Sequence, residues 1–216
     1  MKLYPIFKRA FDLTSAFFSL SLLLPIMVVV GFVVSIESPG GPLFIQRRVG
    51  KEKRIFHMFK FRTMCRNADE MGSSVSGNND WRITRIGKFL RDTKLDEFPN
   101  LLNVLLGQMS IVGPRPELPQ FLPFYKDGYR EIFDIRPGLT GPAQLTYFYE
   151  YALLPKENVE EFYKSKIMKR KLSLDLDYVR NYDLRRDASL ITCTVFRLFI
   201  HERSQTPMEE ITASRR

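Results

Sequence analysis

LTSAFFSLSLLLPIMVVVGFVVSI, residues 13–36, is an uncharged stretch near the start of the chain. As a single helix it would extend about 36 Å, which exceeds the roughly 30 Å of a bilayer's hydrocarbon core. The run is too long for the apolar part of a signal peptide, and no small-residue cleavage pattern clearly follows it. Because so long an apolar run seldom lies buried inside so small a domain, the stretch predicts a membrane helix.

Two features favour a segment that enters the membrane and returns on the same side. Pro25 lies in the middle of the run, and its missing backbone N–H predicts a kink or break there. Basic side chains flank both ends: Lys2, Lys8 and Arg9 before it, and Arg47, Arg48, Lys51, Lys53 and Arg54 after it. Since basic flanks stay on the cytoplasmic side, both obey that rule only if two arms of roughly 17 Å meet at Pro25. The alternative is a spanning helix that tolerates a proline kink.

The remaining pattern predicts a mainly helical α+β fold with a small β-hairpin. Strands are expected in PLFIQRRV (42–49) and RIFHMFKFRTM (54–64), on either side of a turn, and a polar loop follows at 66–80. The expected helices, which include amphipathic helices suited to a membrane interface, lie at about 82–91, 96–106, 158–181 and 188–200. The helix from 96 carries one apolar stripe: Phe98, Leu101, Leu102, Leu105 and Leu106.

These elements predict one integrated domain with three parts. A re-entrant membrane anchor is expected at 1–37, a catalytic part at 38–203 and a loose polar tail at 204–216. Within the anchor, Asp12 stands at helical spacing from Lys8 and Arg9, so we expect these charges to pair where the helix meets the membrane.

Composition narrows the partners and the chemistry. The chain has 33 Lys and Arg against 24 Asp and Glu, a formal charge of +9. Its partner is therefore expected to be anionic: nucleic acid, a membrane surface or a phosphorylated substrate. Cys65 and Cys193 form no CxxC pair, which argues against a zinc knuckle or a disulfide framework. His57 and His201 have no triad partners nearby in sequence, so a catalytic group is expected to be a carboxylate.

The adjacent carboxylates Asp96 and Glu97 are the main candidates for that chemistry. Pro99 fits only the first turn of a helix, which places the pair at a helix N-terminal end. There they would either cap the helix or, with Mg²⁺ and phosphate-binding cations, carry out phosphoryl transfer. Basic residues beside turns or strand ends could gather around them: Lys60, Arg62, Arg91, Lys94, Arg115 and Arg136.

Several of these residues also have a purely structural alternative. Lys60 could protect a sheet edge from aggregation, Arg62 could face solvent, and Arg115, between two prolines, could brace a turn. Asp187 could cap the last helix. A membrane-tethered scaffold or a nucleic-acid binder would need only the charge and the anchor, but the sequence contains no recognisable nucleic-acid reader module.

Five segments of the chain resemble one protein family. They are KRAFD (8–12), PLFIQRRVG (42–50), FKFRTM (59–64), RIGKFLRDTKLDEFPNLLNVLLGQMSIVGPRPE (85–117) and RPGLTGPAQ (136–144). Together with the apolar segment they cover nearly the whole chain, and the longest is highly specific. On these residues the chain resembles the bacterial sugar transferases, the monotopic polyprenyl-phosphate phosphoglycosyl transferases, in their minimal catalytic form.

The resemblance implies a reaction and roles for the site residues. Asp96 matches the family's nucleophilic aspartate, which attacks a UDP-sugar and releases UMP, and Glu97 matches its partner. Mg²⁺ is expected near Asp96. Lys60, Arg91 and Arg115 match phosphate-binding positions, Arg62 and Arg136 lie within matching segments, and Asp187 matches a less certain acidic position.

The same resemblance implies partners and a location. The acceptor is expected to be polyprenyl phosphate, such as undecaprenyl phosphate, and membrane lipid is a further partner, whereas nucleic acid is not. The catalytic part is expected on the cytoplasmic face of a bacterial inner membrane, with Pro25 at the bend of a re-entrant helix. The donor sugar, the glycan (capsule, exopolysaccharide, O-antigen or glycoprotein) and homo-oligomer formation stay open.

Two departures from the family pattern affect these expectations. Leu24 stands before Pro25 where a small residue is usual, so no hydroxyl group is available there to satisfy a broken helix backbone. After RPGLTG the chain reads PAQLTYFYEYA, so the arginine of the usual stretch has no counterpart. The aromatic residues 147–149 could replace its contacts with the sugar or uracil by stacking.

Overall fold

The computed structural model describes residues 4–72, 75–77, 80–125, 128–155 and 158–199, so the expected polar tail lies outside the described residues. The strands are β1 (Leu43–Val49), β2 (Ile55–Phe61), β3 (Ser110–Val112) and β4 (Gly138–Thr140). The α-helices are α1 (Tyr4–Glu37), α2 (Arg85–Thr93), α3 (Asn100–Leu105), α4 (Pro142–Thr146), α5 (Glu150–Leu153), α6 (Val159–Phe162), α7 (Lys169–Asn181) and α8 (Leu184–Phe199). The predicted mainly helical α+β fold with one hairpin is confirmed.

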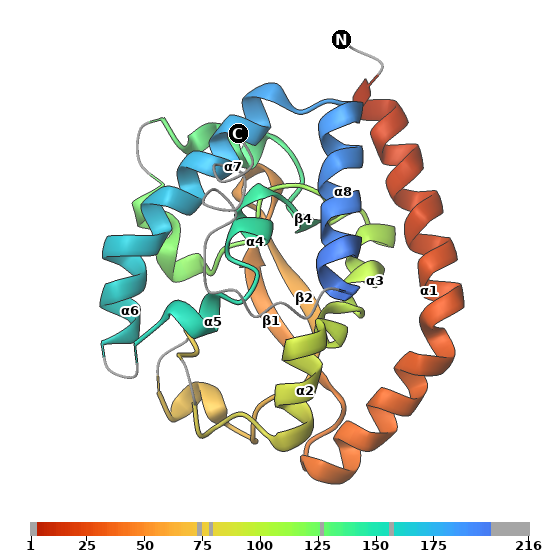
Figure 1. Ribbon diagram of the computed structural model, residues 1–216, viewed down its shortest axis with the longest axis vertical. Coiled ribbons are helices and arrows are strands. Elements are labelled where there is room, and N and C mark those ends of the chain that lie inside the picture. Colours follow the sequence, from red (N-terminus) through yellow and green to blue (C-terminus); the bar gives the residue numbers. More distant parts are fainter. Residues whose placement is uncertain (1–3, 73–74, 78–79, 126–127, 156–157, 200–216) are drawn as a thin grey trace.

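α1 is helical from Tyr4 to Glu37 with Pro25 inside it, so the proline does not end the helix, and its curvature in Figure 1 agrees with the expected kink. The re-entrant topology of this segment stays a prediction. A proline inside a helix removes one hydrogen bond and displaces the preceding turn, which bends a helix without having to end it. Figure 1 shows α1 curving along one side of the molecule from the N-terminal end to the opposite end. By length and composition α1 is able to cross a membrane.

One stripe of α1 lies against the rest of the protein. Asp12, Ala16 and Val34 are buried, and between them Leu20, Leu23, Met27 and Val30 are partly buried against β2, α2, α3 and their neighbours. The spacing of three or four residues is that of one helix face. The other side of α1 exposes large apolar side chains, among them Phe18, Leu22 and Phe32. The anchor therefore packs along the body as part of the fold.

The charges at the start of α1 make contacts other than the expected ones. Asp12 accepts hydrogen bonds from Ser110 Oγ at 2.7 Å and from the backbone N–H of Ile111 at 3.0 Å. Arg9 donates to the backbone carbonyls of Val104 and Met109. The predicted pairing within the helix is thus wrong, because buried groups on α3 and β3 satisfy these side chains instead.

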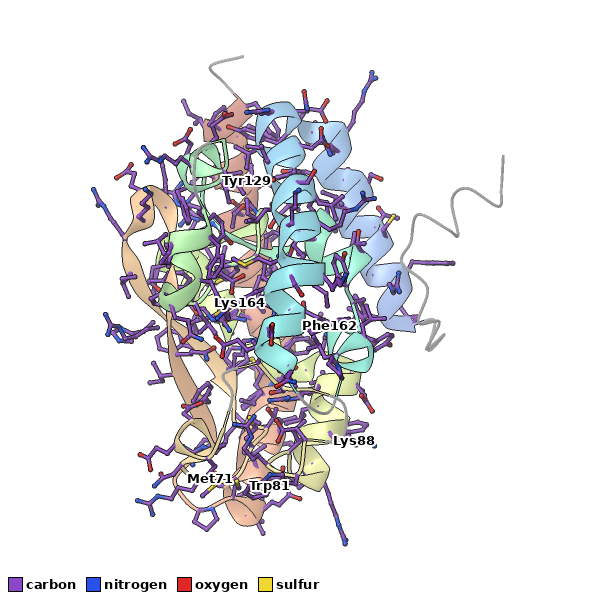
Figure 2. The ribbon with its side chains drawn as sticks, turned by 90° about the vertical axis from the view of Figure 1, so that its left-hand side faces the viewer. Met71, Trp81, Lys88, Tyr129, Phe162 and Lys164 are labelled. Atoms are coloured by element: carbon purple, nitrogen blue, oxygen red, sulfur yellow. The ribbon has the colours of Figure 1, made fainter. Side chains whose placement is uncertain are left out.

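β1 and β2 form the predicted antiparallel hairpin, with Leu43 opposite Phe61 and Val49 opposite Ile55. Glu52 and Lys53 have positive φ in the turn between them. The loop after β2 covers the lower end of the molecule, where Figure 2 shows Met71 and Trp81. Arg82 holds this loop in place, since its guanidinium pairs with Asp80 and donates to the carbonyl of Ala68 at 2.9 Å. The polar stretch predicted as a loop is therefore tied down at its base.

The short parallel pair of β3 and β4 was not predicted. Its two strands come from the IVGPRP and RPGLTGP segments, whose backbones meet directly: Gly113 N–H donates to Thr140 O, and Gly138 N–H to Pro114 O, both at 2.9 Å. A Cβ atom on Gly138 would lie 2.0 Å from the nitrogen of Gly113. The glycines of these segments are therefore needed for the two backbones to approach.

The helices lie close to their predicted positions, but one of them does not bury the predicted face. An almost unbroken helical stretch covers 159–181, with one π-helical turn at Tyr163–Met168, as the predicted helix at 158–181 requires. The single apolar stripe predicted for the helix after Glu97 is wrong. Leu101 is buried, but Leu102 and Leu106 are exposed, while Asn103 is fully buried. The buried amide of Asn103 bonds to β2, and with this face of the helix turned inward Leu102 and Leu106 point away from the core.

Candidate active site

A cavity of about 910 Å³ is lined by both adjacent carboxylates. Of the cations expected near them, Lys60, Arg62, Arg91, Lys94 and Arg115 also line it. They come from β2, the turn after it, the end of α2 and the loop after β3. The structure thus brings together residues spread over more than fifty positions of sequence.

The local backbone presents the two carboxylates on a tight turn. They lie in a 3-10 turn, Leu95–Glu97, between α2 and α3. Lys94 ends α2 in the left-handed conformation, at φ 60°, and Pro99 precedes the first residue of α3. Neither carboxylate caps α3, since the N-cap position is Pro99 and makes no side-chain cap bond. The capping alternative is therefore wrong, and both side chains are available to the cavity.

Glu97 is bound by two cations. Its Oε1 accepts from Lys60 Nζ at 3.0 Å and from Arg115 Nη2 at 3.2 Å. Burial alone would raise the pKa of Glu97, but Lys60, Arg115 and Lys94 together lower it well below its usual range. Glu97 is therefore a fixed negative charge that orients two cations at the edge of the cavity.

Asn103 holds β2 so that Lys60 can reach Glu97. Its Oδ1 accepts from the N–H of Phe59 at 3.0 Å, and its Nδ2 donates to the carbonyl of His57 at 2.7 Å. A buried amide that satisfies both a donor and an acceptor of one strand fixes the position of that strand. Asn103 stands within the longest family segment, but nothing in the sequence marked it as a site residue.

Asp96 has the opposite electrostatic character. Its side chain is only 7% exposed, and its Oδ1 has no hydrogen-bond partner in the part of the chain that the structure describes. Burial and the neighbouring charge of Glu97 raise its pKa, against the opposing effect of Lys60, Lys94 and Arg91. An adjacent pair whose pKa values are shifted apart is typical of a catalytic pair with two different roles.

The donor set around Asp96 fits a magnesium ion that is shared with a substrate. No cluster of three or more His, Cys, Asp or Glu side chains is present among the described residues, so a site made of protein ligands alone is not formed there. Mg²⁺ commonly takes one or two carboxylates and completes its shell with phosphate oxygens and water. The unpartnered Oδ1 of Asp96 could supply one such ligand.

An aromatic wall stands beside these charges. Lys94 Nζ lies 4.9 Å from the ring centre of Phe148 and 6.0 Å from that of Tyr149, and the guanidinium of Arg197 lies 5.4 Å from the Phe148 ring. Tyr147 and Phe148 line the cavity. Cations over aromatic faces form a surface on which a planar ring could stack, so the idea that residues 147–149 contact uracil or sugar stays a prediction.

Arg91 is held beside the cavity, where its Nε donates to Thr63 Oγ1 at 2.8 Å. Arg62 lies at the rim and donates to the carbonyls of Pro39 and Leu43, so it braces the turn after α1. Its expected exposure to solvent is only partial, and its role in substrate binding stays a prediction.

Arg136 does not join the cation group. Its Nε donates to the carbonyl of Gly107 at 2.8 Å, its charge lies near Arg9, and it does not line the cavity. The expectation that it gathers around the carboxylates is wrong. The reason is that the chain reaches the cavity only within β4, at Leu139 and Thr140, and Arg136 precedes that strand.

Asp187 does not line the cavity either. It forms an ion pair with Lys8 and accepts hydrogen bonds from Tyr4 OH at 2.7 Å and from Tyr178 OH at 2.6 Å. It lies inside α8, whose first turn is capped by Asp183 through the N–H of Arg186. The capping alternative for Asp187 is therefore wrong, and its contacts join α1, α7 and α8.

We expect Asp187→Asn to lower the stability of the protein by about 2 kcal/mol, because Lys8 loses its partner at a mostly buried position but can swing towards solvent. For a chain of this size that corresponds to roughly 5 °C in Tm. Thermal unfolding in detergent measures it. Asp183→Asn is the matched control and should leave Tm unchanged, since Asn and Asp cap helices equally well. Equal losses in both variants would contradict the structural role.

The sequence did not identify a second charged group on the cavity wall. Lys171 Nζ donates to Glu150 Oε2 at 2.8 Å and to Tyr163 OH at 3.0 Å, and Tyr163 OH donates to Glu117 Oε2 at 2.9 Å. All four residues line the cavity. A lysine in a polar helix normally faces water, so no local signal distinguishes Lys171. Of the four residues, only Glu117 had a signal in the sequence, because it ends one of the family segments.

Comparison with known proteins gives a consistent result. The family model described as bacterial sugar transferase matches residues 3–201. The chain is 35% identical over 200 residues to a UDP-N-acetylgalactosamine-undecaprenyl-phosphate N-acetylgalactosaminephosphotransferase of Aeromonas hydrophila, covering 89% of this chain and 44% of that protein. It is 33% identical over 198 residues to a UDP-glucose:undecaprenyl-phosphate glucose-1-phosphate transferase of Escherichia coli, covering 90% and 40%. An exopolysaccharide production protein PSS of Rhizobium leguminosarum is 36% identical over 197 residues, covering 88% and 94%. The chain thus spans less than half the length of the first two relatives and nearly all of the third.

Proposed function

Because this chain belongs to the bacterial sugar transferase family, we propose that it transfers a sugar 1-phosphate from a UDP-sugar to polyprenyl phosphate and releases UMP. The observation that carries the proposal is the pair Asp96 and Glu97, whose pKa values are shifted in opposite directions inside a cavity lined by cations. Relatives named for UDP-sugar donors and undecaprenyl phosphate acceptors support the substrate classes.

In the first step, a carboxylate oxygen of Asp96 attacks the phosphorus bonded to the sugar. The bond from that phosphorus to the bridging oxygen breaks, and UMP leaves with the electron pair. A covalent aspartyl phospho-sugar remains on the protein. Burial makes Asp96 a more basic carboxylate than an exposed one, and hence a stronger nucleophile once it is ionised.

In the second step, a phosphate oxygen of the polyprenyl phosphate attacks the same phosphorus. The bond between Asp96 and phosphorus breaks, and the carboxylate is restored. The product is a polyprenyl diphosphate sugar. One site thereby serves donor and acceptor in turn, which suits a single cavity with one group of cations.

The cations supply the charge that both steps need. Three phosphate groups pass through the cavity, and Lys60, Arg91 and Arg115 lie on its wall close to the carboxylates. Such preorganised cations stabilise charge that develops on phosphate oxygens. When bound at Asp96, Mg²⁺ would neutralise part of the charge on the donor diphosphate. Because these cations face a cavity, they are poorly placed to contact a nucleic acid duplex.

The apolar face of α1 supports a reaction at a membrane. Its exposed phenylalanines and leucines suggest membrane association, which an acceptor with a long isoprenoid chain requires. The expected location is the cytoplasmic face of a bacterial inner membrane, where nucleotide sugars are made. The product would serve the synthesis of a bacterial polysaccharide or glycoconjugate, as the name of the Rhizobium relative suggests.

The proposed function predicts Mg²⁺-dependent UMP release from purified protein in nanodiscs. The protein is given undecaprenyl phosphate and, in separate reactions, UDP-glucose, UDP-galactose, UDP-N-acetylglucosamine, UDP-N-acetylgalactosamine and a UDP-diacetamido sugar. We expect one donor to respond and EDTA to abolish the release. Release of UMP that survives removal of all divalent cations would contradict the proposed requirement for Mg²⁺. Release of UDP in place of UMP would contradict the proposed transfer of a sugar phosphate.

A further inference from the structure

We propose that the isoprenoid chain of the acceptor lies in an apolar arm of the cavity, between α1 and α8, with its phosphate directed at Asp96. The arm is lined by Leu23, Ile111, Leu139, Ile191, Val195 and Leu198. This inference rests on the proposed function and adds to it a binding site for one of the two substrates.

The lining of the cavity is divided by element. All of its charged side chains come from β1, β2, α2, α5, α7 and the loops and turns that join the elements. Those contributed by α1, β3, β4 and α8 are uncharged: Ser19, Thr140 and Thr194 besides the six residues of the arm. The same space is therefore polar where the carboxylates lie and apolar on the side of α1 and α8.

The apolar arm borders the surface that would face lipid. Leu22 and Leu24, on either side of Leu23, are 78% and 54% exposed, and Phe196, next to Val195, is 66% exposed. α8 begins beside the start of α1, where Asp187 contacts Lys8 and Tyr4. A chain that leaves the membrane between these helices would meet apolar side chains continuously from lipid to cavity.

The chemistry of the substrates selects the occupant. A UDP-sugar carries charged, hydroxyl or other hydrogen-bonding groups along its whole length, so it fits the polar part and would leave the arm empty. The acceptor has one phosphate and an otherwise hydrocarbon chain. Because that chain passes from lipid to another apolar environment, its burial adds little affinity, and the arm acts mainly by orienting the phosphate.

The wall formed by α8 is anchored at one end and at its middle. Asp187 fixes the start of the helix to Lys8 and Tyr4 of α1, and Thr194 hydrogen-bonds to Thr140 at 2.5 Å. Beyond Asp187, no described residue of α8 is fully buried. A helix held in this way can line a groove without filling it with its own side chains.

Val195→Trp tests the arm, because Val195 lines the cavity yet is 48% exposed, so a larger side chain can be accommodated without unfolding the protein. We expect kcat/KM for undecaprenyl phosphate to fall about tenfold, chiefly through kcat because the phosphate is misoriented, while the KM for the donor stays unchanged. UMP formed in a single turnover without acceptor should also stay unchanged. Phe196→Trp is the matched control: it is the next residue, it is exposed and it does not line the cavity. Equal changes in both variants would overturn the proposal, because they would indicate a general effect on membrane binding.

A binding measurement separates this proposal from the proposed function. A farnesyl phosphate that bears a diazirine on its terminal isoprene is photolysed with the wild-type protein, and the labelled residues are mapped by mass spectrometry. We expect labelling of α8 and α1 at the arm, suppressed by undecaprenyl phosphate and by Val195→Trp. Labelling confined to the outer face of α1 would overturn the proposal that the isoprenoid chain lies in the arm. If the wild type labels at the arm but releases no UMP, the proposed function fails and the lipid site stands.

Discussion

Asp96→Asn is expected to reduce UMP release by at least about a thousandfold. An amide cannot attack phosphorus as a carboxylate does, and no other described carboxylate takes its place, since Glu97 is bound to Lys60 and Arg115. The variant should fold normally. Asp96 is buried with its Oδ1 unpartnered and its pKa raised, so a neutral side chain of the same shape suits the site.

Two measurements check this result. Intact-mass spectrometry of the wild type with the responding UDP-sugar and no acceptor should show the added mass of a sugar phosphate, and Asp96→Asn should show none. Asp69→Asn is the matched control, because Asp69 lines the same cavity but is exposed and lies outside the pair. It should retain both the added mass and the turnover. Normal turnover by Asp96→Asn would show that another group is the nucleophile.

Gly138→Ala is expected to lower the free energy of unfolding by about 4 kcal/mol or more. The new Cβ would lie 2.0 Å from the nitrogen of Gly113 and 2.6 Å from the carbonyl oxygen of Thr140. Both are backbone atoms, which cannot move without separating β3 from β4. Because Arg115 follows β3 closely, the displacement would also weaken its ion pair with Glu97 and reduce activity.

Thermal unfolding in detergent measures the loss, which corresponds to roughly 10 °C in Tm for a chain of this size. Gly31→Ala is the control, since the nearest atoms to its new Cβ are Pro42 Cβ at 3.6 Å and a Phe61 ring carbon at 3.7 Å, which are ordinary contacts. Alanine is also the better helix former, so this variant should unfold at the same temperature or a higher one. A Gly138→Ala protein as stable as the wild type would mean that β3 and β4 do not approach as closely as described.

Properties that depend on neighbours in sequence could be predicted from the sequence. Alternating residues around Gly50 indicated the hairpin, Pro99 located the turn that carries Asp96 and Glu97, and apolar composition identified α1 as a helix of membrane length. The family segments carried the reaction class. Each of these signals is local, because backbone geometry and hydrogen bonds within one element determine it.

The opposite pKa shifts of Asp96 and Glu97 depend on the tertiary structure. In sequence they are equivalent neighbours, and only the approach of Lys60 and Arg115, from positions 37 and 18 residues away, makes one a fixed anion and leaves the other unpartnered. Likewise, Arg136 resembled the other cations until the backbone placed it outside the cavity. Charge in sequence does not reveal which partner a side chain will meet.

The same division holds for the apolar segment. Because α1 is apolar on every side, its composition indicated a helix able to cross a membrane but contained no periodic pattern to show which face packs on the protein. The docked face follows from contacts of Ala16 and Val34 with residues far along the chain. The sequence determined the type and composition of each secondary-structure element and the side chains that are able to react. Tertiary contacts decided which faces, charges and arms of the cavity meet, because burial and electrostatics depend on distance in space.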